Sequence, residues 1–200
     1  MTFVDSTEII FPGTNIRILS GVYGAASTDL PADTVDYAGS WPAGMTDLGY
    51  TKGGIINTLN RTIQDEYFDQ DVDPVVQFTT QREIMMKTVL GQAQPSKLVT
   101  ALGYGTVTTV AASAGVRGHT DVDIAGGLPP INDIVPAFEI EMPDGEAMRG
   151  IFYRAQVRAS VSLDFKKDTT VNIPFEARAM RDTSGSNDRV LKLRKILAAL

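Results

Sequence analysis

Strict alternation of apolar and polar residues marks the C-terminal half of the chain. Within residues 151–165 every odd-numbered residue is apolar, and after Phe152 every even-numbered residue is polar or charged. A period of two is typical of a strand with one buried face and one solvent-facing face. Fifteen residues at about 3.3 Å each would reach roughly 50 Å, whereas most strands have about 3–10 residues. The pattern therefore predicts a strand that is either bent midway or unusually long.

The same alternation recurs on both sides of this segment. Residues 136–142 (PAFEIEM) and 171–179 (VNIPFEARA) alternate in the same way, and turn-forming residues at 143–146 and 166–169 separate the three segments. Three alternating segments joined by tight turns predict an antiparallel meander. In this scheme Glu139 and Glu141 occupy the wet face, where Arg154 and Arg158 are expected to pair with them.

The N-terminal half is also predicted to be mainly β. Residues 15–23 form one expected strand, residues 74–90 form one or two, and residues 46–61 form a hairpin or a long loop with extended flanks. A helix is expected over 95–103, because Pro95 suits its first turn and Gly103 its C-terminal cap. Residues 104–133 read as a loop or irregular hairpin, and the tail 187–200 fits a short helix or a final strand equally well.

Composition narrows the possible functions. The net charge is −6 and the pI about 4.8, which disfavours general binding to nucleic acid. The absence of cysteine excludes disulfides, and the single histidine excludes a histidine cage for a metal. The first residues lack the pattern of a signal peptide, and no apolar run approaches the roughly 20 residues of a membrane span. These features predict a soluble protein without a membrane partner.

Two acidic motifs contain residue types that bind metal ions. Asp69, Asp71 and Asp73 have the spacing that begins an EF-hand loop, but Pro74 replaces the required glycine and Thr80 the required glutamate. A solvated acidic surface is the simpler interpretation of this run.

The second motif is formed by His119, Asp121 and Asp123, which would face one side of a strand. In a glycine-rich stretch such a histidine is usually just exposed. No G-x-S-x-G nucleophile motif is present either. The sequence therefore predicts no catalytic residue, no cofactor site and no metal, and the protein is not expected to be an enzyme.

The stretch SWPAGMTDLGYTKGGI, residues 40–55, holds the only tryptophan of the chain, Trp41, together with four glycines. It offers no chemistry for catalysis. Aromatic residues beside mobile backbone are typical of protein interfaces, although a single tryptophan often belongs to a core. The segment is therefore interpreted as an assembly surface, with a core position for Trp41 as the alternative.

Several stretches together resemble the major tail (tail tube) proteins of long-tailed, siphovirus-type bacteriophages. They are NIRILSGVYGA, STDLPADTVDY, WPAGMTDLGYTKGGI, PVVQFTTQREIMMKTVLG and NIPFEARAMRDTSG. The resemblance covers roughly residues 15–103 and 134–185, and residues 104–133 depart from it most. Its most specific part is Trp41 with the following DLGYT and Gly54.

This resemblance implies a mainly β fold, an antiparallel β-sandwich or barrel of two sheets with one flanking α-helix and with extended loops and arms. Residues 1–200 would form a single domain. Within it, 1–14 would be an N-terminal arm, 104–133 a long loop or insertion, and 183–200 a C-terminal arm.

The resemblance also implies a role. Subunits would self-assemble into hexameric rings stacked into a tube, the conduit for DNA ejection. Partners would be the tape measure, tail terminator and distal tail proteins, and double-stranded DNA would pass without specific binding. The protein would be made in the host bacterial cytoplasm and reside in the virion tail.

This role implies residues that contact neighbouring subunits and residues that face the lumen of the tube. Trp41, Leu48, Tyr50 and Gly54 are expected to contact neighbouring subunits. The acids expected to face the lumen are Asp65, Glu66, Asp69, Glu139 and Glu141. The alternative is a free-standing β-sandwich binding module, for instance for carbohydrate, with Trp41, Tyr50, Tyr67 and Phe68 as an aromatic platform.

Overall fold

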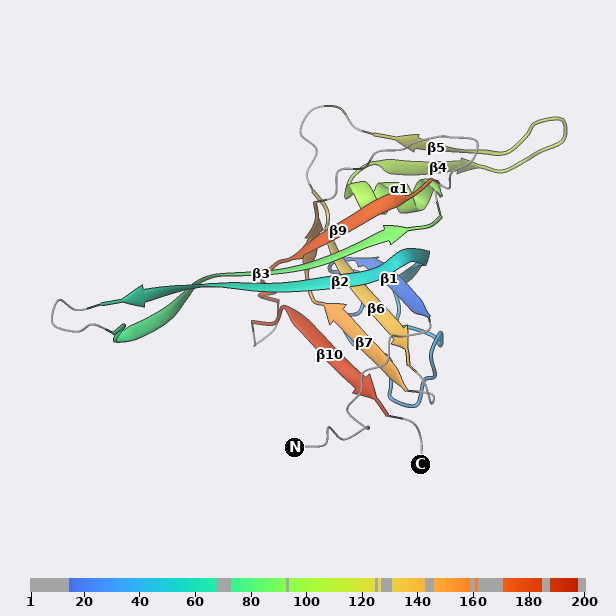
Figure 1. Ribbon diagram of the computed structural model, residues 1–200. Coiled ribbons are helices and arrows are strands. Elements are labelled where there is room, and N and C mark those ends of the chain that lie inside the picture. Colours follow the sequence, from blue (N-terminus) through green and yellow to red (C-terminus); the bar gives the residue numbers. More distant parts are fainter. Residues whose placement is uncertain are drawn as a thin grey trace.

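A computed structural model describes residues 15–67, 73–92, 94–124, 126, 131–142, 146–158, 161, 171–184 and 188–197. These residues form mainly β-structure with one helix, α1 (Figure 1). The elements are β1 (Ile16–Val22), β2 (Thr46–Glu66), β3 (Val76–Leu90), α1 (Pro95–Leu102), β4 (Thr106–Val110), β5 (His119–Asp123), β6 (Asp133–Glu141), β7 (Ala147–Phe152), β8 (Ala155–Val157), β9 (Ile173–Ala179) and β10 (Leu191–Ile196). The predicted mainly β fold with a flanking helix is confirmed.

Six strands close into a barrel. The order is β1-β2-β3-β9-β8-β6, with β6 pairing back onto β1, and every pairing is antiparallel. Closure leaves no free edge within the barrel itself. Strands β7 and β10 extend the sheet beyond β6, so β1, β6, β7 and β10 form a second layer that shares two strands with the barrel.

The predicted meander is present, and its central strand is bent midway. Strand β7 pairs with β6 up to Ala137↔Ile151, and β8 resumes the pairing at Ile134↔Ala155. Three residues on one side face two on the other, so the strand carries a one-residue bulge that bends it. The bend lets β7 pair with β10 while β8 pairs with β9. Most of residues 159–165 lie outside the described residues.

Two apolar clusters form the core. The larger fills the barrel and includes Phe138, Phe152 and Phe175, none more than 1% exposed. The smaller lies on the opposite face of the β1–β6–β7 layer, where segment 23–45 covers buried residues such as Leu19 and Ile151. Segment 23–45 is therefore an integral cover of the sheet.

Helix α1 has the predicted limits. Proline stands in its first turn, and Gly103 takes the left-handed conformation at φ 77° while its N–H donates to Val99 O at 2.9 Å. Beside α1, β4 and β5 form a two-stranded hairpin, so the described part of 104–133 is a hairpin rather than an open loop (Figure 1). With eight residues, α1 is too short to cross a membrane, and the described residues contain no other helix that could.

The expectation of a hairpin or loop at 46–61 was wrong. These residues belong to β2, a continuous strand of 21 residues. Three of its glycines have left-handed φ values, at Gly49 (85°), Gly53 (83°) and Gly54 (82°), and the register shifts at these places. The glycines therefore form bulges within a strand instead of a turn that ends it.

The C-terminal tail contains β10, which pairs with β7, so its alternating LKLRKI pattern specifies a strand and not a helix. Just before it, Asp182 accepts hydrogen bonds from Ser184 and from the Tyr23 hydroxyl at 2.8 Å. The bonds from Ser184 and Tyr23 lower the pKa of the Asp182 carboxyl. The ionised carboxylate joins the start of this tail to the end of β1.

Candidate assembly surface

The outer part of the β2–β3 hairpin projects far beyond the barrel (Figure 1). We call residues 59–66 and 76–82 the arm. Every residue of the arm is exposed, including large apolar side chains such as Leu59 (61%), Ile63 (44%) and Phe78 (43%). A two-stranded ribbon gains little stability by itself in water. An arm that exposes large apolar side chains and covers no core of its own is suited to contact another molecule.

Two arginines face each other across the arm. Arg61 lies directly opposite Arg82 in the register, next to the pair Leu59↔Ile84. Ile84 is only 7% exposed, so this level marks where the barrel core ends and the arm begins.

A groove of about 510 Å³ opens at this base, between the arm and the start of β10. Its lining includes Leu59, Arg82, Ile84, Arg189, Leu191 and Leu193. The groove thus combines apolar side chains with guanidinium groups.

A second hollow, of about 390 Å³, surrounds Tyr50. Tyr37 and Arg17 line it, and Arg17 Nε donates to Asp47 Oδ2 at 2.5 Å. Burial, and then the charges of Glu139 and Glu141, raise the pKa of the Tyr37 hydroxyl. The hydroxyl therefore stays protonated and able to donate a hydrogen bond.

A buried ion pair fixes segment 23–45 on the sheet. Arg149 Nε donates to Glu139 Oε1 at 2.7 Å, and both side chains are 0% exposed. The guanidinium also donates to the carbonyl oxygens of Ala32 (3.3 Å), Val35 and Asp36 (3.2 Å). Glu139 Oε2 accepts from the Ala38 N–H at 3.1 Å. The pair is thus satisfied by the segment that covers it, as buried charges must be.

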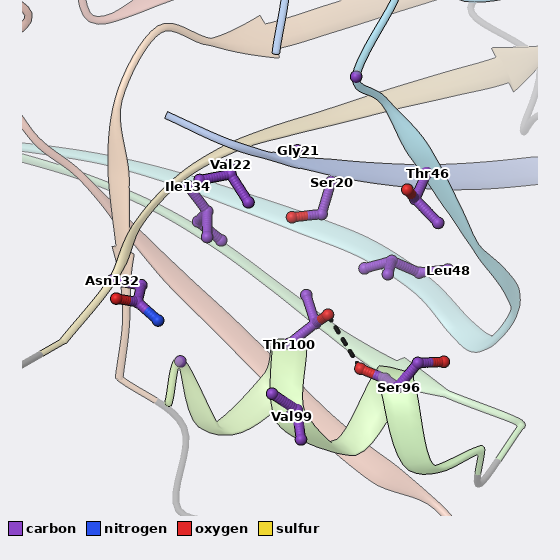
Figure 2. Close-up of a pocket in the computed structure, with 12 residues that line it drawn as sticks. Ser20, Gly21, Val22, Thr46, Leu48, Ser96, Val99, Thr100, Asn132 and Ile134 are labelled. Atoms are coloured by element: carbon purple, nitrogen blue, oxygen red, sulfur yellow. Dashed lines mark hydrogen bonds between the residues drawn. The ribbon is translucent and has the colours of Figure 1, made fainter. Parts of the chain in front are cut away.

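A third hollow, of about 300 Å³, lies between α1 and strands β1 and β2 (Figure 2). Figure 2 shows Ser20, Leu48 and Val99 around it, and Thr100 Oγ1 donates to Ser96 O at 3.0 Å. Its lining contains hydroxyl and apolar side chains but no carboxylate, histidine or lysine. No general base stands there to activate a hydroxyl.

Those residues of the two acidic motifs that the structure describes do not converge on a metal site. His119 Nε2 lies 3.5 Å from Asp121 Oδ2 on the exposed strand β5. Among the described residues no three acidic or histidine side chains converge as metal ligands would. Asp69 and Asp71 lie outside the described residues.

A sequence model of the family described as "Phage tail tube protein" matches residues 4–190. The chain belongs to the phage tail tube protein family. No curated protein matches it. The resemblance drawn from the sequence is confirmed. The protein is a structural component of the virion tail, and the family implies assembly with other phage tail proteins.

The tail tube protein places the four expected contact residues differently. Leu48 is 2% exposed and packs in the barrel core, so it is not a surface residue, because β2 turns it inward beside Ile18. Trp41 is half-buried against the smaller core cluster. Gly54 lies in a bulge of β2 and its carbonyl accepts from Thr88 Oγ1 at 2.8 Å. Only Tyr50, 76% exposed, lies on open surface.

Mutation of the two aromatic residues is expected to separate these environments. Tyr50→Ala should change the free energy of unfolding of the monomer by no more than about 0.5 kcal/mol, as is usual for exposed sites. Trp41→Ala should destabilise the monomer measurably, although by less than the roughly 3–5 kcal/mol of a fully buried tryptophan. Chemical denaturation of both variants measures the difference, and equal stabilities would contradict the packing of Trp41.

The expected lumen acids also differ in environment. Glu139 is fully buried and bound to Arg149, so the expectation that it faces a channel was wrong. The odd-numbered residues of β6 lie beneath segment 23–45. Alternation alone predicts that this face of the strand is exposed to solvent. Arg154 binds Asp133 at 2.6 Å and not Glu139.

Glu141 is half-buried and accepts from Asn15 Nδ2. Asp65 and Glu66 are exposed at the end of the arm, and Asp69 lies outside the described residues. The aromatic residues of the alternative function lie in different environments. Trp41 packs on the body, Tyr67 follows the end of β2, and Phe68 lies outside the described residues.

Proposed function

We propose that this tail tube protein forms hexameric rings that stack into the tube through which DNA is ejected into the host. The arm carries the proposal, because it exposes apolar side chains on a ribbon that projects beyond the barrel. It can bury them only against another molecule. The protein has no enzymatic role in this proposal, and it is made in the cytoplasm of the host bacterium.

The arm and the barrel are different surfaces of the same chain. If the arm of one subunit binds the body of the next, the contact is heterologous, and such contacts generate closed rings or open helices. A stacked-ring tube requires both lateral and axial contacts. Tyr50, Trp41 and Gly54 remain proposed contact residues in addition to the arm. The tube ends would meet the tape measure, tail terminator and distal tail proteins.

Electron microscopy of the purified protein tests this function. Concentrated protein is expected to form rings or tubes of uniform diameter, alone or when seeded with tail initiator proteins. A strictly monomeric protein under both conditions would reject the proposal and favour a free-standing binding module.

The acidity of the chain is compatible with passage of DNA. Six copies at −6 give a ring a formal charge of 6 × −6 = −36. Like charge prevents adhesion of the duplex within a Debye length of roughly 8–10 Å. The proposed lumen acids are Asp69 and Glu141, whereas Asp65 and Glu66 at the end of the arm are assigned to a contact between subunits, as argued below.

Replacing Glu141 with lysine in assembled virions is expected to slow DNA release most at low ionic strength, because an added cation would bind phosphate. The measurement is the rate of DNA release as a function of salt concentration. Unchanged release at low salt would remove Glu141 from the lumen.

A further inference from the structure

We propose that the groove at the base of the arm binds the acidic end of the arm of a second copy. The inference rests on the proposed function, since it names two surfaces that meet when the tube assembles. The groove is the one lined by Leu59, Arg82, Ile84, Arg189 and Leu193. The acidic end consists of Asp65, Glu66 and Asp73, which lie on either side of residues 68–72 between β2 and β3.

The arginine pair indicates that a counter-charge comes from outside the chain. Arg61 and Arg82 lie directly opposite each other, and like charges in such cross-strand positions repel. Within the described residues neither guanidinium has a hydrogen-bond or ion-pair partner. The other two charged residues of β3 have partners of opposite charge, with Glu83 bound to Arg178 at 3.1 Å and Lys87 bound to Glu176 at 3.1 Å.

The groove beside this pair is positively charged as well. Arg189 also lines it, stacks over the Tyr153 ring at 4.7 Å and interacts electrostatically with the Asp182 carboxylate. The one acid in the lining, Asp188, is bound to Arg181 at 2.6 Å. Arg82 and Arg189 therefore give the groove a cationic character that an acidic segment would complement.

The apolar part of the groove selects a peptide rather than a phosphate backbone. Leu59 is 61% and Leu193 55% exposed, and both line the groove. Phosphates gain nothing from exposed leucines, whereas a peptide that carries apolar side chains buries them. The acidic end of the arm has such side chains next to its acids, in Tyr67 (58% exposed) and Val75 (50%).

The acidic end cannot reach the groove of its own chain. Asp65 lies four residues beyond Arg61 along an extended strand, a distance of about 13 Å at roughly 3.3 Å per residue. The arm continues away from the barrel in this direction (Figure 1). The complementary surfaces therefore meet only between copies, in a head-to-tail contact that can repeat from subunit to subunit.

Charge reversal with mixing tests the contact. One variant carries Arg82→Glu, and the other carries Asp65→Lys with Glu66→Lys. Matched controls are Arg117→Glu and the pair Asp121→Lys with Asp123→Lys, which make the same charge changes on or beside the exposed β4–β5 hairpin. Sedimentation and electron microscopy at low salt measure tube yield, and thermal melting confirms that each monomer is folded.

Each arm variant alone is expected to lower tube yield about tenfold or more, because like charges then meet at the interface. The controls should assemble as the unmodified protein does. A one-to-one mixture of the two arm variants should restore tubes, because the reversed end of one then meets the reversed groove of the other. If Arg82→Glu does not fold, Arg61→Glu takes its place.

Two results would overturn the contact while leaving the proposed function intact: arm variants that assemble normally, or a mixture that stays defective. Loss of binding to double-stranded DNA with unchanged tube yield would assign the arginines to DNA and equally reject the contact. By contrast, an unmodified protein that never forms rings or tubes would reject the proposed function itself.

Discussion

Replacing Arg149 with methionine is expected to lower the free energy of unfolding of the tail tube monomer by about 3 kcal/mol. The buried Glu139 carboxylate then loses its closest cation and keeps only Arg17, 3.9 Å away, and the Ala38 N–H. Glu139 and Arg149 are both 0% exposed and bonded at 2.7 Å. The guanidinium also binds carbonyl oxygens of Ala32 and Asp36, so its removal frees segment 23–45 as well. Methionine fills much of the same volume, which limits the contribution of a cavity to the loss.

Two further variants serve as controls for Arg149→Met. Arg181→Met removes an ion pair of similar length, Arg181–Asp188 at 2.6 Å, but both partners are exposed, so its melting curve should match that of the unmodified protein. Adding Glu139→Gln to Arg149→Met should recover part of the stability, since the buried charge is then gone. Urea denaturation followed by circular dichroism measures all three. An Arg149→Met variant as stable as Arg181→Met would show that the pair contributes nothing.

The sequence predictions were correct for elements whose conformation depends on residues close together in the chain. Alternation gave the meander of β6, β7–β8 and β9, and it also anticipated the bend, since so long a strand is rare. The combination of Pro95 and Gly103 gave the helix, and the described residues match it. In these elements the residues that set the conformation are neighbours in sequence.

The errors concern contacts between residues distant in sequence. Glycines at 49, 53 and 54 read as a turn, but thirteen paired positions along β3 and four along β1 hold β2 extended through its bulges. Glu139 was predicted to be exposed to solvent, because alternation distinguishes the two faces of a strand but does not show which segments cover them. The β6–β7 register places Arg149 directly opposite Glu139, a partner that alternation alone does not identify.

The sequence predicted that the chain has an assembly surface but did not locate the arm. A contact surface around residues 40–55 was expected, yet Leu48 belongs to the core, and the most exposed apolar ribbon lies further along the same strand. Leu59, Ile63 and Phe78 follow no amphipathic pattern that marks an arm. The arm is recognised only from the structure, where β2 and β3 stay paired outward from Ile84, the outermost buried residue of β3.

Removal of the outer arm is expected to abolish tube formation and leave the monomer folded. Thr62 and Gln81 lie directly opposite each other, so deletion of residues 63–80 and closure with Asn-Gly makes a two-residue hairpin turn. All strand residues lost in this way are exposed, and none belongs to either core cluster. The melting temperature of the monomer should therefore change by only a few degrees, since no buried apolar surface is removed.

A matched deletion separates the loss of the arm from the loss of any hairpin. Val110 and His119 end the β4–β5 pairing, so residues 111–118 can be replaced by Asn-Gly in the same way. We expect that variant to keep assembling, because the contact surfaces inferred above remain. Size-exclusion chromatography and electron microscopy compare the two proteins. Tubes formed without the arm would mean that the barrel alone makes the ring contacts, whereas folded monomers without tubes would assign assembly to the exposed ribbon that also carries the acidic end.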